Sequence, residues 1–318
     1  MNTCGAKNST HGASMRHLKT FELIEAVVRF GSIRKAAEES NITASALNRR
    51  INTFEEEFGS EIFERLPRGM RLNPAGELLM DYYLKQKSEL QRVQSQVSDL
   101  SGHRRGHITI ACSQALLPYF LPKNIAKYRQ EHPGVTFAVN VRDRAQVEQE
   151  LKNFKSDIAL VFEPRYLADF ECMFALPQPV HVVFSNSHPL AMNANRSIRL
   201  RHCLEHPHIA PCTGLGVRDL LDNASKKIGR SLNPVVETES FELIRSYILY
   251  EQLLGFQVPI GMPENTAHDL VTQPIDTQDV PAGNLFLGHL RGRTLPVAAS
   301  RFADQLRYEL EKLSSSFY

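Results

Sequence analysis

The sequence predicts an α+β multidomain protein, in which an N-terminal winged helix-turn-helix and a long linker helix precede a C-terminal α/β domain. Three observations predict this class. Residues 32–58 read as two short helices joined by a tight turn, and residues 74–100 carry an apolar repeat of helical spacing. From residue 107 onward, short β-branched runs alternate with helical stretches. At 318 residues the chain is long enough for two or three domains.

The first fourteen residues are small and polar, and we expect them to be a disordered extension. They lack the apolar run that a signal peptide requires. The winged helix-turn-helix domain is expected over residues 15–73. It opens with an amphipathic helix that ends at Gly31, and the apolar positions of this helix are Leu18, Phe21, Ile24 and Val28.

The helix-turn-helix follows directly. Ser32 can cap its first helix, and Asn41 tolerates the left-handed conformation that a sharp turn needs. Thr43 can then cap the second helix. The apolar residues of this second helix share one stripe, and they are Leu47, Ile51, Phe54 and Phe58.

The rest of the second helix carries side chains that can read base edges. Asn and Arg pair bidentately with adenine and guanine in the major groove, where a helix-turn-helix places its second helix. Residues 67–71 read as a short basic hairpin, a wing that can lie against phosphates. The residues expected to contact double-stranded DNA are Arg34, Ala44, Ser45, Asn48, Arg49, Asn52, Arg68 and Arg71. The alternative is an ordinary helical hairpin whose arginines are solvated.

Residues 74–106 are expected to form a linker helix and a hinge. Asn73 can cap this helix and Pro74 suits its first position. Apolar residues then recur at spacings of four and three, interrupted only at Gln86, which is typical of a heptad seam. The helix either packs within its own subunit or dimerises, and its polar flanks favour dimerisation. The predicted seam consists of Leu79, Tyr83, Leu90, Val93, Val97 and Leu100.

The segment from residue 107 to residue 318 reads as one α/β domain. Strands are predicted at 108–112, 136–141, 158–162 and 181–185, and helices at 116–129 and 146–154. This alternation indicates mostly parallel sheets.

These motifs together resemble those of the LysR-type transcriptional regulators. The family opens with a pattern like MRHLKTF at 15–21, followed by a Gly-Ser turn, an AAE triplet like that at 36–38 and a recognition helix like ALNRRI at 46–51. IFER at 62–65 and LNPAG at 72–76 continue the match, which is dense over 15–100 and looser beyond. Ala44-Ser45 and Asn48 depart from the family's usual residues at base-facing positions, so its operator sequences cannot be carried over.

The resemblance implies a sequence-specific DNA-binding transcriptional regulator, controlled by a small-molecule effector between two lobes that resemble periplasmic binding proteins. Lobe I would comprise 107–184 and 285–318, and lobe II 185–284. A homodimer or homotetramer, a contact with RNA polymerase and a cytoplasmic location are implied as well. No cofactor and no catalytic activity are expected.

Ligands of open α/β sheets bind beyond the carboxyl ends of the strands. The residues expected to bind the effector there are Ser113, Gln114, Arg142, Asp143, Phe162, Glu163, Thr213 and Gly214. In the family, loops at the positions of Ser113 and Thr213 often hold a small carboxylate, and Arg142 can grip an acid bidentately. Asp143 and Glu163 favour either a ligand with donor groups or pairing with Arg142. A small polar or anionic metabolite is therefore expected, and ordinary capping of strand ends is the alternative for each residue.

Residues 202–212 contain three His and two Cys, but their spacing matches no common zinc template, so no metal is expected. The spacing of Cys203 and Cys212 is similar to that of the peroxide-sensing members of the family. A redox-responsive regulator is thus one alternative, although a free Cys is usually a small buried hydrophobe. Cys4, Cys112 and Cys172 show no pairing pattern, and five cysteines suit a reducing compartment.

Composition adds little. The net charge of +2 carries no global signature of nucleic-acid binding, and no stretch of about 18 apolar residues predicts a transmembrane helix. No phosphate-cradling glycine loop and no GxSxG elbow is present. An enzyme-like two-lobed domain fused to a DNA-binding head is the second alternative.

Overall fold

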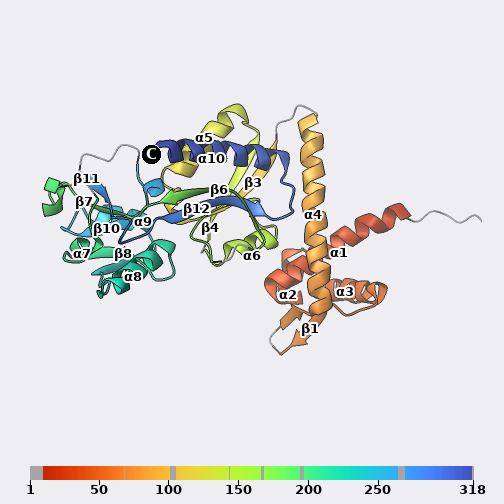
Figure 1. The fold of residues 1–318 in the computed structure, drawn as a ribbon. Helices are drawn as coiled ribbons and strands as arrows, with labels where there is room; N and C mark the ends of the chain where they lie inside the picture. Colours follow the sequence, from red (N-terminus) through yellow and green to blue (C-terminus); the bar gives the residue numbers. More distant parts are fainter. Residues whose placement is uncertain are drawn as a thin grey trace, which may run out of the picture. The chain divides into compact units, whose positions relative to one another are not determined.

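The computed structural model describes residues 10–67, 69–100, 105–142, 144–165, 168–193, 197–263 and 269–316. The chain divides into two compact units, Met1–Leu90 and Gln91–Tyr318. The helix α4 runs from the first unit into the second (Figure 1).

The first unit is a winged helix-turn-helix, as the sequence predicts. Its elements are α1 (Thr10–Phe30), α2 (Ile33–Glu39), α3 (Ala44–Phe58), β1 (Phe63–Leu66), β2 (Gly69–Leu72) and α4 (Pro74–Leu100), of which α4 ends in the second unit. The turn between α2 and α3 has the predicted left-handed residue, because Asn41 adopts φ 53°. The Thr43 hydroxyl accepts from the Ala46 N–H at 3.2 Å, so it caps α3, whereas the Ser32 side chain makes no capping bond to α2.

The wing is the antiparallel pair β1–β2. It is fixed to the rest of the unit by a backbone hydrogen bond from the Met70 N–H to the Gly31 carbonyl at 3.0 Å. The wing therefore holds the turn that precedes α2. Arg68, which the sequence predicts to contact DNA, lies outside the described residues.

The beginning of the first unit differs from the sequence prediction. Helix α1 begins at Thr10, so residues 10–14 are helical and not part of a disordered extension. Residues 1–9 lie outside the described part of the chain.

Three aromatic rings connect α4 to α3 through α1. The Tyr83 ring of α4 stacks on Phe21 of α1 with centroids 5.0 Å apart, and Phe21 meets Phe54 of α3 edge-on at 5.4 Å. The Tyr83 hydroxyl also lies 3.4 Å from the Glu25 carboxylate. The first turns of α4 are thus part of the core of this unit.

This packing changes the predicted dimer seam. Leu79 and Tyr83, predicted to line the seam, are 8% and 2% exposed and lie in their own subunit's core. The residues one position earlier, Leu78 and Tyr82, are exposed instead. The exposed apolar stripe of α4, hereafter the α4 stripe, consists of Leu78, Tyr82, Leu90, Val93, Val97 and Leu100.

The second unit contains two five-stranded sheets, each of which forms a lobe (Figure 1). Lobe I, residues 106–178 and 283–316, has strand order β4-β3-β5-β12-β6. Helices α5 and α10 contact one side of this lobe, and α6 packs against β3, β5 and β12 in a separate cluster that covers the other side. The elements of lobe I are β3 (Gly106–Cys112), η1 (Gln114–Leu116), α5 (Phe120–Glu131), β4 (Val135–Val141), α6 (Val147–Lys152), β5 (Ile158–Phe162), β6 (Phe170–Gln178), β12 (Gly283–Leu290) and α10 (Val297–Ser316).

Lobe II, residues 181–274, has strand order β11-β7-β10-β8-β9. Helices α8 and α9 pack against its strands. The elements of lobe II are β7 (His181–Ser185), η2 (Pro189–Asn193), α7 (Leu200–Cys203), β8 (His208–Pro211), α8 (Gly216–Lys227), β9 (Val236–Thr238), α9 (Phe241–Tyr247), β10 (Leu254–Gln257), η3 (Pro259–Gly261) and β11 (Leu270–Pro274).

The chain crosses between the lobes twice, and the two crossings are joined. The Ile275 N–H donates to the Val180 carbonyl at 2.9 Å, and both residues are buried. The first crossing thus lies at residues 179–180 and not near Phe184. The predicted strand 181–185 exists, but it belongs to lobe II, because Val183 pairs with Gly255 and with Thr272 there.

The sheets are also less parallel than predicted. Strands β3, β4 and β5 are parallel, but β12 runs antiparallel to both β5 and β6. Strand β6 has no counterpart among the predicted strands. Its position at the sheet edge leaves it partly exposed, so its sequence lacks the continuous apolar run of β5.

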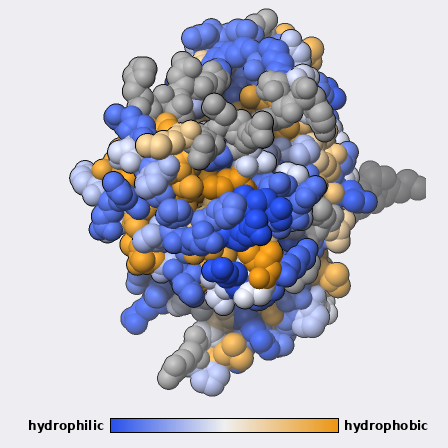
Figure 2. All heavy atoms as spheres, turned by 60° about the vertical axis from the view of Figure 1, so that its left-hand side comes forward, coloured by the Kyte–Doolittle hydropathy of each residue, from blue (hydrophilic) through white to orange (hydrophobic). Residues whose placement is uncertain are grey.

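Hydrophilic residues cover most of the face drawn in Figure 2, with hydrophobic residues gathered near its middle. Among the described residues, no helix is both long and apolar enough to cross a membrane.

The N-terminus of α4 generates a stability prediction. Asn73 caps this helix, since its Oδ1 accepts from the Gly76 N–H at 2.8 Å. A Cβ on Gly76 would overlap the Ile62 carbonyl oxygen. Alanine normally stabilises a helix by about 1 kcal/mol relative to glycine, but we expect Gly76→Ala to destabilise the first unit by about 1–3 kcal/mol.

Denaturant-dependent hydrogen exchange of the α3 amides measures the stability of this unit apart from the other one. Glu77→Ala, on the exposed neighbouring residue, is the control and should change the free energy of unfolding by no more than about 0.5 kcal/mol. A stability gain in Gly76→Ala would contradict the close approach of α4 to Ile62.

Candidate functional site

The first candidate site is the exposed face of α3. Leu47, Ile51 and Phe54 are buried, and at about 100° per residue Ser45, Arg49 and Asn52 lie on the opposite side of the helix. All three are exposed. Asn48 is partly buried beside them, and Ala44 is exposed at the start of the helix. The predicted base-reading residues therefore share one accessible surface.

The charged residues around α3 have different roles. Arg34 is exposed on α2, whereas Arg71 pairs with Glu64 across the wing at 2.8 Å. Glu55, in the acidic run at the end of α3, accepts the Ile62 N–H at 2.8 Å and so ties the helix to the strand that follows. Part of the acidic run is therefore structural.

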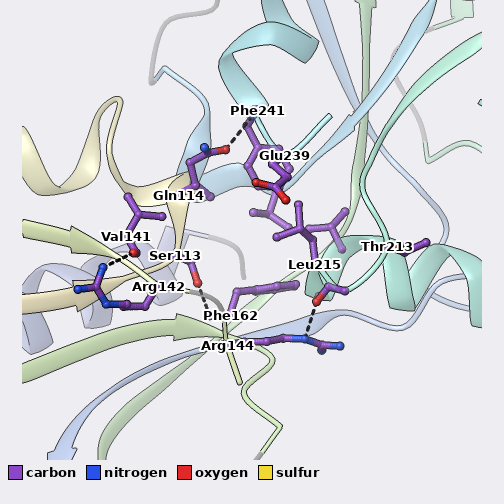
Figure 3. A pocket seen from close by; sticks show the side chains of 15 residues that line it. Ser113, Gln114, Val141, Arg142, Arg144, Phe162, Thr213, Leu215, Glu239 and Phe241 are labelled. Carbon is purple, nitrogen blue, oxygen red and sulfur yellow. Dashed lines mark hydrogen bonds between the residues drawn. The ribbon is translucent and has the colours of Figure 1, made fainter. Parts of the chain in front are cut away.

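The second candidate site is a cavity of about 180 Å³ between the lobes, at the carboxyl ends of β3, β4, β5 and β8 (Figure 3). Six of the eight predicted effector residues line it, which are Ser113, Gln114, Arg142, Phe162, Thr213 and Gly214. The lining residues that were not predicted are Ala115, Val141, Arg144, Leu215, Gly216, Val217, Glu239, Phe241 and Val258. Asp143 lies outside the described residues.

Two polar side chains of the cavity are oriented by backbone N–H groups. The Ser113 hydroxyl accepts from the Phe162 N–H at 2.9 Å, and the Gln114 Oε1 accepts from the Phe241 N–H at 3.1 Å (Figure 3). The acceptor of the Gln114 amide is thus occupied, which leaves its NH₂ group as a donor. Ser113 likewise keeps its hydroxyl hydrogen for donation.

The predicted charged residues do not act as expected. Arg142 pairs with Glu150 of α6 at 3.1 Å, so its charge is already balanced within lobe I. Glu163 does not line the cavity. Its carboxylate accepts the Asn284 N–H at 2.6 Å, because the residue turns toward β12 at φ 47°.

Sequence reasoning missed Arg144, two residues beyond Arg142. Its guanidinium donates to the Gly214 carbonyl at 2.9 Å, to the Glu163 carbonyl at 3.1 Å and to the Asp219 carboxylate. Both arginines follow the same strand, so the sequence provides no signal that separates a side chain facing the cavity from one facing α6.

Both lobes contribute to the apolar part of the lining. Gly216, the first residue of α8, allows the Phe162 ring to pack against this helix, since a Cβ there would lie 2.8 Å from Cδ1 of the ring. The N-cap residue of α8 is Leu215, whose side chain provides no capping bond. Residues 215–217 at the start of α8 line the cavity, and the N-cap side chain does not satisfy the N–H groups of this first turn, which favour anions.

The cysteines of the redox alternative are poorly suited to that role. Burial raises the pKa of the Cys203 thiol to about 12. Burial, with the nearby Glu237 carboxylate, also raises the pKa of Cys212. Since the thiolate is the reactive form, both shifts oppose peroxide sensing. The described residues contain no cluster of three metal-ligating side chains.

Two family models match the chain. The model described as "Bacterial regulatory helix-turn-helix protein, lysR family" matches residues 16–77, and the one described as "LysR substrate binding domain" matches residues 101–311. Among curated relatives, the HTH-type transcriptional activator CmpR of Synechocystis is 25% identical over 91% of this chain and 94% of its own. The RuBisCO operon transcriptional regulator of Allochromatium vinosum is 25% identical over 94% and 97%.

Solved structures of similar fold include a full-length OxyR variant from Pseudomonas aeruginosa, with TM-score 0.65, 18% identity and coverage of 91% of this chain and 94% of that one. Full-length CbnR complexed with its target DNA has TM-score 0.59 at 13% identity, covering 92% and 99%. The effector-binding domain of QuiR in complex with shikimate has TM-score 0.55 at 19% identity, covering 65% and 98%.

Proposed function

Because the chain belongs to the LysR family of transcriptional regulators, we propose that α3 reads its operator and that a small carboxylate effector, held between the lobes, controls it. Family membership makes the protein a DNA-binding regulator with an effector-binding domain. The residues, the effector class and the assembly are the parts that we propose.

The accessible face of α3 supports the proposed DNA contacts. Ser45, Arg49 and Asn52 are exposed together, and no ion pair of Arg49 competes for its guanidinium among the described residues. Arg49 can therefore form the bidentate contact that selects guanine. Arg34 and Arg71 flank this face and suit phosphate contacts, although Glu64 weakens the charge of Arg71. CbnR, of similar fold, forms a complex with its target DNA.

The donor character of the cavity is the observation that carries the effector proposal. Ser113 and Gln114 are oriented by the backbone N–H groups that they accept, so the Ser113 hydroxyl hydrogen and the Gln114 NH₂ group remain as donors, and Thr213 adds a hydroxyl. The N–H groups at the start of α8 contribute partial positive charge. A carboxylate matches these donors, the Glu239 carboxylate that also lines the cavity suits a hydroxyl or other donor on the same ligand, and the volume of about 180 Å³ suits a small molecule. QuiR, of similar fold, has shikimate bound in its effector domain.

A sensing role is better supported than an enzymatic one. The described residues that line the cavity include no histidine, cysteine or lysine, and Glu239 is the one carboxylate among them, so no nucleophile paired with a base faces the ligand. The absence of these groups is consistent with binding rather than turnover. We infer that the protein acts in the cytoplasm, where its DNA is, and that it contacts RNA polymerase there.

The α4 stripe supports assembly through this helix. Six large apolar residues extend from Leu78 to Leu100 on one side of α4, at spacings of three and four except for the eight residues between Tyr82 and Leu90, and burying them against a second copy removes this surface from water. We propose a homodimer through α4, with a homotetramer formed by further contacts.

The first prediction concerns base reading. Arg49→Ala should weaken binding to the specific operator by about 1–3 kcal/mol while leaving random DNA nearly unaffected. Arg50→Ala is the matched control, because this exposed arginine lies about 100° away around α3. Gel-shift titrations on both DNAs measure the difference. Equal losses in the two variants would remove Arg49 as the base reader.

The second prediction concerns the effector. Gln114→Glu keeps the acceptor for the Phe241 N–H but replaces the NH₂ donor by a carboxylate oxygen. In a thermal-shift screen, small organic acids that raise the melting temperature of the wild type should lose this effect in Gln114→Glu.

Thr213→Val and Thr213→Ser provide the matched pair at the opposite side of the cavity. The valine removes the hydroxyl, so the same acids should raise the melting temperature of this variant less. The serine retains the hydroxyl, so its melting temperature should rise as that of the wild type does. An acid that stabilises Gln114→Glu as much as the wild type would show that it binds elsewhere.

The third prediction concerns the α4 stripe. Leu90→Glu places a charge in the proposed helix pair, where burial without a partner is costly, so the dimer should dissociate at concentrations at which the wild type is assembled. Gln91→Glu adds the same charge one residue along and should leave assembly intact. Sedimentation velocity distinguishes these results, and an assembled Leu90→Glu variant would mean that α4 is not the interface.

A further inference from the structure

Arg144 connects the two lobes across the cavity. It follows β4 in lobe I, yet its Nε donates to the Gly214 carbonyl of lobe II at 2.9 Å and its Nη2 donates to the Asp219 carboxylate on α8. Its Nη1 donates to the Glu163 carbonyl of lobe I at 3.1 Å. The Arg144 side chain is only 11% exposed, whereas that of Asp219 is 43% exposed. One guanidinium is therefore bound to both lobes at once.

The other ion pairs near the cavity stay within one lobe. Arg142 pairs with Glu150 inside lobe I. Arg218, on α8, pairs with Asp222 and Glu237, all inside lobe II. Asp219 and Asp222 thus lie one turn apart on the same helix, each with an arginine partner, but only the partner of Asp219 belongs to the other lobe.

We propose that Arg144 and Asp219 form a latch that favours the present arrangement of the lobes before any effector binds. This inference goes beyond the proposed function, because it concerns the protein without effector and without DNA. Arg144 also lines the cavity, so a carboxylate beside it competes with Asp219 for the same guanidinium. Effector occupancy and the strength of the latch are then linked.

The latch sets the equilibrium between lobe arrangements that an effector then shifts. A ligand shifts the equilibrium between two lobe arrangements only by its differential affinity for them. The starting point of this shift is the equilibrium in the protein without ligand. An ion pair with a partly exposed carboxylate shifts this equilibrium modestly. The two hydrogen bonds from Arg144 to backbone carbonyls stabilise the same lobe arrangement further. Removing Asp219 should therefore have a smaller effect than replacing Arg144.

The test measures the separation of the lobes in the full-length chain by pulsed electron spin resonance. One spin label is attached to the native, exposed Cys172 of lobe I and the other to Lys226→Cys of lobe II, with Cys4→Ser and Cys212→Ser in the background. Labelled chains are diluted with unlabelled chains, so that distances within one chain dominate. No effector and no DNA are added.

We expect Asp219→Asn to raise the population of a second lobe separation about two- to fivefold. Arg144→Lys, which retains the charge but cannot make three divergent bonds, should raise it by about tenfold or more. Asp222→Asn is the matched control and should give the distance distribution of the parent. The isosteric Asp219→Asn decides the matter if Arg144→Lys folds poorly by circular dichroism.

Identical distributions for Asp219→Asn and Asp222→Asn would overturn the latch. That result would leave the proposed DNA and effector sites untouched, because those are tested separately by gel shift and thermal shift. Conversely, unchanged operator binding in Arg49→Ala would overturn the proposed base reader but would leave the latch between the lobes untouched.

Discussion

The effector-binding part of the chain depends on the hydrogen-bonded double crossing at Val180 and Ile275. These two buried segments are the covalent connections between the sheets, and the bond between them keeps the connections together. The two crossings therefore share one hydrogen-bonded point at the boundary between the lobes. The cavity exists because both sheets direct the carboxyl ends of parallel strands toward this boundary.

The charges at that boundary are largely balanced before any ligand arrives. Arg142 is paired with Glu150 and Arg144 with Asp219, so the cavity offers hydroxyl, amide and backbone donors in place of an unpaired cation. Neutral donors select a ligand anion by its shape, because hydrogen bonds are directional. An unpaired guanidinium, in contrast, binds many different acids.

The sequence was sufficient for features that depend on local spacing. The left-handed Asn41, the caps at Thr43 and Asn73, strand β5 and the cavity residues Ser113 and Thr213 all follow from short patterns. Features decided by three-dimensional partners were not accessible. Strand β7 belongs to lobe II only because of its pairing with β10 and β11.

The α4 helix illustrates the same limit. Its repeat places Leu79 and Tyr83 in register with Leu90, but the first unit buries these two residues, and the exposed stripe continues through Leu78 and Tyr82. A helical repeat alone does not tell which of two adjacent apolar residues faces the chain's own core. Arg144 was missed for a related reason, since its partners lie 19 to 75 residues away in the sequence.

The aromatic contact of Tyr83 with Phe21, and of Phe21 with Phe54, has a consequence for the spacing of operator half-sites. These rings belong to α4, α1 and α3, so the start of the linker helix and the recognition helix are parts of one packed body. If two copies pair through α4, the angle at which the two helices cross determines the separation of the two α3 helices. The distance between half-sites on DNA is then set by dimer geometry, while the identity of the bases is left to the residues that we propose to read them, Arg49 and its neighbours.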